Sequence, residues 1–442
     1  MAKLTKIYSC SNCGAQTPKW SGRCLDCGAW GTFQEEIIDA HEQKKSDLKI
    51  SPTAVADLNN IEFKKLSRIQ TGISEFDRVV GGGIIPGSLV LVGGEPGIGK
   101  STLMLQIINS LDSLYISGEE SAAQIKSRAD RLGLTGKINF VAETNVEKII
   151  ASILEQKPQL AIIDSIQTIY SSDVPSESGS VNQIRACAVK LLKIAKEKNI
   201  SIVITGHITK DGLLAGPKTL EHLVDAVIYL EQKNNDFRLL RTAKNRFGST
   251  NEIGLFAMTA AGFQEIKNPS GIFLEQQKNV QTGNVVSCIM EGTRPFLVEV
   301  QALVTKTVFG YPQRKASGVD LNRLQILIAV LSKRANINLS NQDVHLNIVG
   351  GLKATETSLD LAICAAIISS LLNQVIDNKT IILSEVGLGG ETRNISKLKE
   401  RLQEAAKLGF TTALAPAEIN GAGLKIIKIN DIKQLTDYIV KK

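Results

Sequence analysis

Short apolar runs alternate with longer amphipathic segments through the middle of the chain, from about residue 67 to residue 270. In each longer segment apolar residues recur three or four positions apart, which is the spacing of one helix face. Helices are expected at 102–108, 121–132, 146–156 and 181–198, and strands at 88–92, 114–116, 138–141, 160–164 and 200–204. Strands that alternate with helices in this way form a parallel sheet covered by helices, so this region is predicted to be an α/β domain.

A second alternation of the same kind follows from residue 271 to residue 442. This stretch is long enough to bury a core of its own. Strands are expected at 285–289, 296–303, 344–349 and 380–383, and helices at 320–335, 356–372 and 396–408. The pattern therefore predicts a second, separate α/β domain.

The first 33 residues lack the apolar periodicity of the other two regions and are marked by regularly spaced cysteines. Two Cys-x-x-Cys pairs are separated by ten residues, and their members are Cys10, Cys13, Cys24 and Cys27. Four thiolates at this spacing close a tetrahedral Zn²⁺ site, which leaves no open position and is therefore structural. A module this small cannot hold a core without metal, so zinc is expected to drive its folding. Trp20 and Trp30 are expected to pack its miniature core.

Composition narrows the class of protein. Residues 34–66 are polar and charged and are predicted to be a linker. No apolar run is long enough to cross a membrane, and the N-terminus lacks the apolar core of a secretion signal, so a cytoplasmic location without membrane contact is expected. The net charge of +7 permits nucleic-acid binding without demonstrating it. The seven cysteines, an odd number in a long chain, argue against a disulfide framework.

One glycine-rich segment carries the strongest chemical signal. It lies between a predicted strand and a predicted helix and matches the phosphate-binding loop G-x-x-x-x-G-K-[ST]. Its backbone N–H groups and the helix N-terminus would hold the phosphates of ATP, Lys100 would contact the β- and γ-phosphates, and Ser101 would ligate Mg²⁺. The residues expected to bind the nucleotide are Gly94, Glu95, Pro96, Gly97, Ile98, Gly99, Lys100, Ser101 and Thr102.

Three further polar residues follow predicted strands. Asp164 ends an apolar strand and is predicted to hold Mg²⁺ together with Ser101. Glu119 follows the strand at 114–116, which is expected to neighbour the nucleotide strand, and is favoured as the base that orients the attacking water. His207 ends another strand and is the candidate that contacts the γ-phosphate. A structural role for His207 is about equally compatible with its position.

Two loops are candidates for contact with a charged polymer. The glycine-rich, partly basic loop at 211–218 follows His207 at the expected ligand edge. A second segment combines two cations with an amide at a turn and suits phosphate contacts, either to DNA or to the nucleotide of a neighbouring subunit. Its residues are Lys244, Asn245, Arg246, Phe247 and Gly248. A solvated basic turn without a ligand is the alternative.

Taken in order along the chain, these motifs resemble those of the bacterial RadA (Sms) family of recombination proteins. The resemblance rests on the Cys₄ finger, the phosphate loop, the segment 244–248 and the segment 291–301 with its Glu-Gly-Thr-Arg-Pro run. It covers nearly the whole chain. It implies a RecA-like P-loop ATPase core with a central, mostly parallel sheet at 67–270, and a Lon-protease-like α/β domain at 271–442.

The resemblance also implies a function and partners. Members of this family are DNA-dependent ATPases of DNA repair that form hexameric rings, move on single-stranded DNA and drive branch migration of recombination intermediates. A RecA-type recombinase, branched DNA, ATP, Mg²⁺ and Zn²⁺ are the implied partners and cofactors. In such a ring, Lys244 or Arg246 can act on the γ-phosphate held by the neighbouring subunit.

Two other functions compete with this one. An ATP-dependent protease would use a Ser–Lys pair, and Ser358 and Lys399 fall near the corresponding positions of Lon-type peptidases. Thr357 and Leu359 replace the small residues that normally flank such a serine. A non-motor ATP switch with the same core is the other alternative, and DNA-stimulated hydrolysis separates it from a motor.

Overall fold

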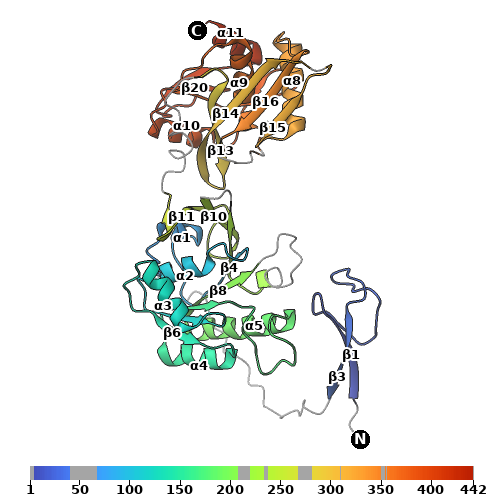
Figure 1. Ribbon diagram of the computed structural model, residues 1–442, viewed down its shortest axis with the longest axis vertical. Coiled ribbons are helices and arrows are strands. Elements are labelled where there is room, and N and C mark those ends of the chain that lie inside the picture. Colours follow the sequence, from blue (N-terminus) through green and yellow to red (C-terminus); the bar gives the residue numbers. More distant parts are fainter. Residues whose placement is uncertain are drawn as a thin grey trace, which may run out of the picture. The chain divides into compact units, whose positions relative to one another are not determined.

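The computed structural model describes residues 4–39, 67–207, 220–232, 237–266, 281–308, 310–349, 354 and 356–441. The chain divides into two compact units, Met1–Glu265 and Ile266–Lys442 (Figure 1). The boundary expected between residues 270 and 271 lies outside the described residues.

The N-terminal part of the first unit is a small antiparallel ribbon. Its strands are β1 (Leu4–Cys10), β2 (Gln16–Thr17) and β3 (Phe33–Asp39), in the order β2-β1-β3. Strand β1 pairs with β3 along its whole length, from Leu4 opposite Asp39 to Cys10 opposite Phe33. The linker was predicted to begin at residue 34, but β3 continues to Asp39, because these residues pair with β1 along its whole length. The rest of the predicted linker, 40–66, lies outside the described residues.

A nine-stranded sheet organises the remainder of the first unit (Figure 1). Its strand order is β12-β11-β10-β9-β4-β8-β7-β5-β6. The six strands from β9 to β6 pair in parallel, and β10, β11 and β12 add an antiparallel edge. The strands are β4 (Leu89–Gly94), β5 (Ser113–Ser117), β6 (Asn139–Ala142), β7 (Leu160–Asp164), β8 (Ser201–His207), β9 (Ala226–Gln232), β10 (Phe237–Asn245), β11 (Ile253–Thr259) and β12 (Gly262–Glu265).

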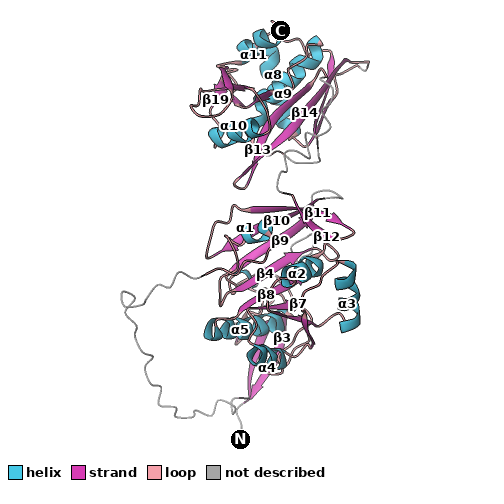
Figure 2. Cartoon of the chain, turned by 90° about the vertical axis from the view of Figure 1, so that its left-hand side faces the viewer, coloured by secondary structure: helices cyan, strands magenta, loops and turns pink. Residues whose placement is uncertain are grey.

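Helices cover both faces of this sheet, as Figure 2 shows. They are α1 (Ser74–Val79), α2 (Lys100–Ile108), α3 (Ala122–Arg131), α4 (Val146–Gln156) and α5 (Val181–Lys198). Alternate residues of β4 belong to two different cores: Val90 and Val92 pack with α1, α2 and α3, whereas Leu89 and Leu91 pack with α4 and α5. A strand buried on both faces needs a continuous apolar run, which explains why β4, β5, β7 and β8 were visible in the sequence.

The strand order corrects one expectation about the site. Strand β5 was expected to neighbour β4, but β8 and β7 lie between them. The sheet is doubly wound, so β8, which comes last of the four in sequence, pairs directly with β4. The carboxyl ends of these parallel strands still meet at one edge, which keeps their terminal residues within reach of one another.

The second unit is built on a mixed seven-stranded sheet in the order β15-β16-β14-β13-β17-β20-β21. Its helices are α8 (Leu321–Arg334), α9 (Asp360–Leu372), α10 (Leu398–Lys407) and α11 (Ile432–Val440), with a short 3₁₀ turn, η2 (Thr357–Leu359), before α9. The strands are β13 (Asn284–Glu291), β14 (Arg294–Lys306), β15 (Arg314–Ser317), β16 (Gln342–Ile348), β17 (Thr380–Ile382), β20 (Thr412–Ala415) and β21 (Lys425–Lys428), and the pair β18 (Glu385–Val386) and β19 (Thr392–Arg393) lies apart from the sheet.

Helix α9 is the centre of the second unit. Its residues from Asp360 to Ser369 are all buried, and it packs against β13, β14, α8 and α11. Such a helix is apolar around its whole circumference because other elements surround it. Within the described part of the chain, no helix combines the length and apolarity needed to span a membrane.

Candidate functional site

The phosphate loop joins the buried strand β4 to helix α2. Gly97 and Gly99 have positive φ angles of 74° and 111°, a conformation that side-chain-bearing residues rarely adopt. A Cβ on Gly99 would also lie 2.8 Å from the ring of Phe263. Ile98 is buried and anchors the loop, whereas Glu95, Pro96 and Gly97 are exposed. The loop therefore has the backbone turn that its sequence predicts.

Lys100, the first residue of α2, is 5% exposed. Its Nζ donates to the carbonyl oxygens of Gly94 and Glu95, each at 3.0 Å, and lies 3.2 Å from Nδ1 of His207. Burial lowers the pKa of Lys100, and the nearby carboxylates of Asp164 and Glu119 oppose that change. The ammonium group is thus held at the mouth of the loop by weak acceptors that phosphate oxygens can replace.

Asp164 ends β7 and is held by two buried hydroxyl groups. Tyr115 donates to Oδ2 at 2.6 Å, and Thr205 donates to Oδ1 at 2.5 Å. Burial, together with the Asp164 carboxylate, raises the pKa of Tyr115 well above its usual value, so the phenol stays a donor. Sequence reasoning missed both residues. Their only signal was a polar atom at a buried strand position, which must find a partner.

Glu119, Ser165 and His207 come together at the carboxyl ends of β5, β7 and β8. The hydroxyl of Ser165 donates to Oε1 of Glu119 at 2.6 Å, and Nε2 of His207 lies 3.6 Å from the same oxygen. The side chain of Glu119 is 43% exposed, so water reaches it. Ser165, which is fully buried, was not singled out from the sequence as a partner of Glu119.

The two proposed magnesium ligands are placed as follows. Ser101 and Thr102 lie in the first turn of α2, where Ser101 is half-buried and Thr102 is buried. Asp164 lies two strands away from β4 at the same edge of the sheet. A hydroxyl and a carboxylate suit Mg²⁺, which takes oxygen ligands and keeps several waters. The pairing of Ser101 with Asp164 stays a prediction.

The four N-terminal cysteines form one cluster, and their sulfur atoms all lie within 4.8 Å of one another. Cys10 Sγ is 3.8 Å from Cys27 Sγ, and Cys13 Sγ is 3.5 Å from Cys24 Sγ. Ligands at about 2.3 Å from a tetrahedral Zn²⁺ stand about 3.8 Å apart, so this donor set fits zinc.

The two cysteine knuckles have the same backbone geometry. The N–H of Gly14 donates to the carbonyl of Cys10, and the N–H of Gly28 donates to the carbonyl of Cys24, at 2.8 and 2.9 Å. Both glycines have φ of 75°. The duplication predicted from the sequence is therefore present in the backbone as well.

Both tryptophans of the chain contradict the expectation that they pack a core. Trp20 is 62% exposed and Trp30 is 75% exposed. The cysteine cluster lies at the end of the ribbon where β1 stops, with Cys10 and Cys24 buried, and a module of this size has little apolar interior for two indole rings.

The segment 244–248, here called the basic turn, is folded onto its own domain. Nζ of Lys244 donates to the carbonyl oxygens of Glu221, His222 and Val224, the last at 2.9 Å. Burial and the nearby charge of Arg246 lower the pKa of Lys244. Lys244 is therefore bonded to the backbone of its own domain, whereas Arg246 and Gly248 are exposed.

The remainder of the basic turn contacts the segment that precedes β4, including Arg68, Val80 and Gly81. Arg68 donates to the carbonyl of Phe247 at 2.8 Å, and Asn245 donates to the carbonyl of Val80 at 3.3 Å. The α-carbon of Gly81 approaches Gly248 so closely that a Cβ on Gly248 would lie 3.3 Å from it. The turn is thus placed by the segment that leads into the phosphate loop.

Asp225 connects the basic turn to β4. Its carboxylate is 2% exposed and accepts from the backbone N–H of Leu89 at 3.0 Å and from Nζ of Lys196 at 2.7 Å. Arg246 lies 3.3 Å from its other oxygen, and half of the Arg246 side chain stays exposed. Asp225 was not identified from the sequence. The glycine-rich loop at 211–218 lies outside the described residues.

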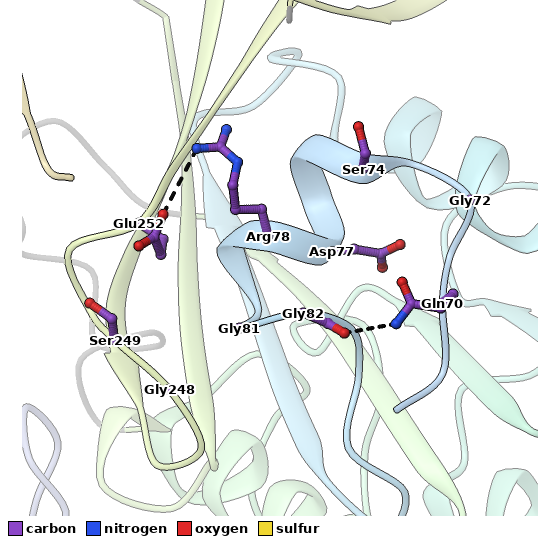
Figure 3. Close-up of a pocket in the computed structure, with 10 residues that line it drawn as sticks. All are labelled: Gln70, Gly72, Ser74, Asp77, Arg78, Gly81, Gly82, Gly248, Ser249 and Glu252. Carbon is purple, nitrogen blue, oxygen red and sulfur yellow. Dashed lines mark hydrogen bonds and ion pairs between the residues drawn. The ribbon is translucent and has the colours of Figure 1, made fainter. Parts of the chain in front are cut away.

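A pocket of ≈ 770 Å³ lies beside the basic turn (Figure 3). It is lined by residues before and within α1, by Gly81 and Gly82, and by Gly248, Ser249 and Glu252. Gln70 donates to the carbonyl of Gly82 at 2.8 Å across it. No residue of the phosphate loop lines this pocket, so it is distinct from the nucleotide site.

In the second unit, Ser358 does not have the surroundings of a nucleophile. It is 2% exposed, its hydroxyl donates to the carbonyl of Cys288 at 3.4 Å, and it accepts from Nη1 of Arg401 at 3.1 Å. Lys399 is exposed on α10. An arginine cannot take the proton of the serine, because its pKa is far above neutral. The geometry gives no support to the protease alternative.

Family models match three separate parts of the chain. Residues 8–35 match the rubredoxin metal binding domain, residues 69–138 match the KaiC ATPase, and residues 307–419 match subunit ChlI of Mg-chelatase. Together with the sheet topology, they confirm the expected fold class: a zinc ribbon, a RecA-like ATPase core with a mostly parallel sheet, and a C-terminal α/β region.

Curated relatives match the chain from end to end. The DNA repair protein RadA of Bacillus subtilis is 46% identical, over 98% of this chain and 98% of its own length. That of Pseudomonas aeruginosa is 44% identical, over 99% and 100%. Among solved structures, a KaiC-like protein of Pyrococcus horikoshii is 23% identical with a TM-score of 0.38, and covers 46% of this chain and 99% of its own.

Proposed function

The chain belongs to the family of the bacterial DNA repair protein RadA, and from this premise we propose that it is a DNA-dependent ATPase of homologous recombination. In this proposal it forms a ring-shaped motor on single-stranded DNA and drives branch migration of recombination intermediates. The observation that carries the ATPase part is the meeting of Lys100, Glu119 and His207 at one edge of the sheet.

Each residue of that edge has a distinct task in the proposed hydrolysis. The loop amides and Lys100 hold the β- and γ-phosphates in place of the carbonyls of Gly94 and Glu95. Glu119, fixed by Ser165 and open to solvent, orients the attacking water as its proton leaves. His207 lies between Lys100 and Glu119 and reports the γ-phosphate to the loop that follows it.

Two metals complete the proposal. Mg²⁺, held by Ser101 and through water by Asp164, would neutralise charge on the transferred phosphoryl group. Tyr115 and Thr205 fix the direction in which the Asp164 carboxylate points. Zn²⁺ would bind Cys10, Cys13, Cys24 and Cys27 and stabilise the ribbon without taking part in hydrolysis.

The proposed ring gives the basic turn its role. In a hexamer, Lys244 or Arg246 would contact the γ-phosphate held by the next subunit, and Lys244 would exchange backbone carbonyls for phosphate oxygens. We assign residues 67–270 to the ATPase domain and 271–442 to a scaffold of the ring with an additional DNA surface. A RecA-type recombinase as partner and a cytoplasmic location belong to the same proposal.

Steady-state ATP hydrolysis with and without single-stranded DNA tests this function. Single-stranded DNA should raise the rate, and the stimulation should fall steeply as salt increases, because phosphate contacts release counterions. The Lys244→Ala variant should lose the stimulation and still bind nucleotide. Lys193→Ala, a change at a 71% exposed lysine of α5, is the matched control and should behave as the wild type. Hydrolysis that is indifferent to DNA would favour the non-motor switch.

A further inference from the structure

The zinc ribbon has an exposed aromatic surface that has no role in the proposed ATPase site. Trp20 and Trp30 are 62% and 75% exposed, although large aromatic side chains are normally buried. Both indole rings lie against the same glycine: a Cβ at Gly22 would be 3.8 Å from Cη2 of Trp20 and 4.0 Å from Cζ3 of Trp30. We call Trp20, Gly22, Arg23 and Trp30 the indole surface.

The indole surface is fixed by the fold of the second knuckle. Arg23 and Trp30 are partners in an antiparallel bridge, and Gly31 donates to the carbonyl of Gly22 at 2.9 Å. The Arg23 guanidinium lies 5.8 Å from the centre of the Trp30 ring and donates from Nε to the carbonyl of Gly28. The Trp30 ring is therefore held in place before any partner binds, which lowers the entropic cost of binding.

The charges beside the rings indicate the kind of partner. Lys19 and Arg23 are both exposed, and each is next to or in contact with a tryptophan. Flat aromatic faces combined with cations are the elements with which proteins bind single-stranded nucleic acid: bases stack on the rings and phosphates pair with the cations. A groove for an apolar peptide would need no cations beside its aromatic residues.

We propose that the indole surface is a stacking site for the bases of single-stranded DNA, separate from the ATPase domain and from its basic turn. This inference rests on the proposed action on single-stranded DNA. Stacking requires no particular base, so contact at this surface would follow the strand without selecting a sequence.

The chain allows a direct test because Trp20 and Trp30 are its only two tryptophans. Tryptophan emission of the full-length, zinc-loaded protein therefore reports on the indole surface alone. An end-labelled oligothymidylate is titrated while label anisotropy and tryptophan emission are recorded together. We expect the emission to fall and to saturate at the same concentration as the anisotropy. An oligonucleotide of equal length with abasic interior positions should bind through its phosphates without quenching.

Variants separate stacking from other causes of binding. Trp20→Ala and Trp30→Ala should each weaken binding of the oligothymidylate about tenfold, and Trp→Phe at the same positions should restore most of it. Leu25→Ala is the matched control, since Leu25 is 93% exposed on the same knuckle and is apolar without a ring. Zinc content, measured after release with a thiol reagent, shows whether each variant keeps its fold.

The outcomes are distinct. Anisotropy that rises while tryptophan emission stays constant overturns the inference and leaves the proposed function standing. No rise in anisotropy means that the proposed function itself fails. Quenching by the abasic oligonucleotide, or a loss with Leu25→Ala equal to that of the tryptophan variants, overturns stacking. The latter result would show that the loss does not depend on an aromatic ring.

Discussion

The edge of the ATPase sheet and the centre of the second unit contain the same types of side chain. At the sheet edge a ligand can replace their contacts, whereas in the second unit they are bonded to one another. Lys100 and Arg401 are both buried cations near carboxylates, and a serine hydroxyl bonds to the carboxylate of Glu119 in the first case and to Arg401 in the second. Lys100 is bound by two loop carbonyls and an imidazole, all of which a ligand can replace. Arg401 is fully buried and forms a bidentate ion pair with Glu356. It also donates to the carbonyl oxygens of Ser396 and Cys288 and to the hydroxyl of Ser358.

The two clusters differ in whether solvent reaches their side chains and in whether their polar atoms are already hydrogen-bonded. At the sheet edge Glu119 is 43% exposed, so a substrate water can reach the carboxylate. Around Ser358 the buried hydroxyl is bonded to Arg401 and to the carbonyl of Cys288, so the serine itself is closed to a substrate. Residue types alone therefore do not identify an active site. The four predictions below test this contrast, from the largest expected effect to the smallest.

Lys100→Ala should have the largest effect. The variant loses the cation that faces the β- and γ-phosphates, and hydrolysis should fall about 1,000-fold, or about 4 kcal/mol in the barrier. Phosphate release from ATP in the presence of DNA measures it. The thermal unfolding of the variant should stay close to that of the wild type. A retained rate would show that this edge is not the nucleotide site.

Arg401→Met should chiefly affect stability. Glu356 would lose its buried partner, and the free energy of unfolding of the second unit should fall by about 3 kcal/mol. Hydrogen exchange of peptides from this unit in urea measures the change. Lys399→Met, an exposed change on the same helix, should alter it by less than about 0.5 kcal/mol. Equal effects of the two variants would contradict the closed network.

Tyr115→Phe removes one hydroxyl from the carboxylate of Asp164. The concentration of Mg²⁺ that gives half-maximal hydrolysis should rise about tenfold, because residues that orient a metal ligand affect metal affinity on that scale. Titration of Mg²⁺ at fixed ATP measures it. Tyr170→Phe, at a more exposed tyrosine of the same domain, should leave the titration unchanged. If the maximal rate falls and the Mg²⁺ titration does not move, Tyr115 does not act through the metal.

Ser358→Ala should have the smallest effect. The hydroxyl contributes one hydrogen bond to Arg401, so stability should change by about 1 kcal/mol or less and ATP hydrolysis should be unaffected. Neither the wild type nor the variant should degrade casein. Casein cleavage by the wild type that disappears in the variant would revive the protease alternative.

The sequence was most informative where burial forces a continuous apolar run. Strand β7 and helices α4 and α5 have the limits that were predicted, because each has an unambiguous period and a clear start, such as the Ser180 cap of α5. The antiparallel strands β11 and β12 were not predicted, whereas the strand expected at 238–242 lies within β10. Partly exposed positions interrupt the apolar run in both of the missed strands.

The sequence predicted which residues belong to the site better than it predicted the contacts between them. Lys100 was identified from the phosphate-loop motif, and Glu119 and His207 from their positions after strands. Ser165 and Tyr115 were not identified as partners, because a buried hydroxyl carries no sign in the sequence of the group that it bonds. The exposure of Trp20 was also unpredictable. It depends on how little interior remains once four cysteines fill the ribbon.

The position of Asp225 has a mechanical consequence. Its carboxylate holds the first residue of β4, and Gly94 at the other end of that strand opens the phosphate loop, about 17 Å away at 3.3 Å per residue. A fully buried strand is stiff along its axis. A displacement of Arg246 would therefore pass through Asp225 to β4, and along that strand to the first residue of the phosphate loop.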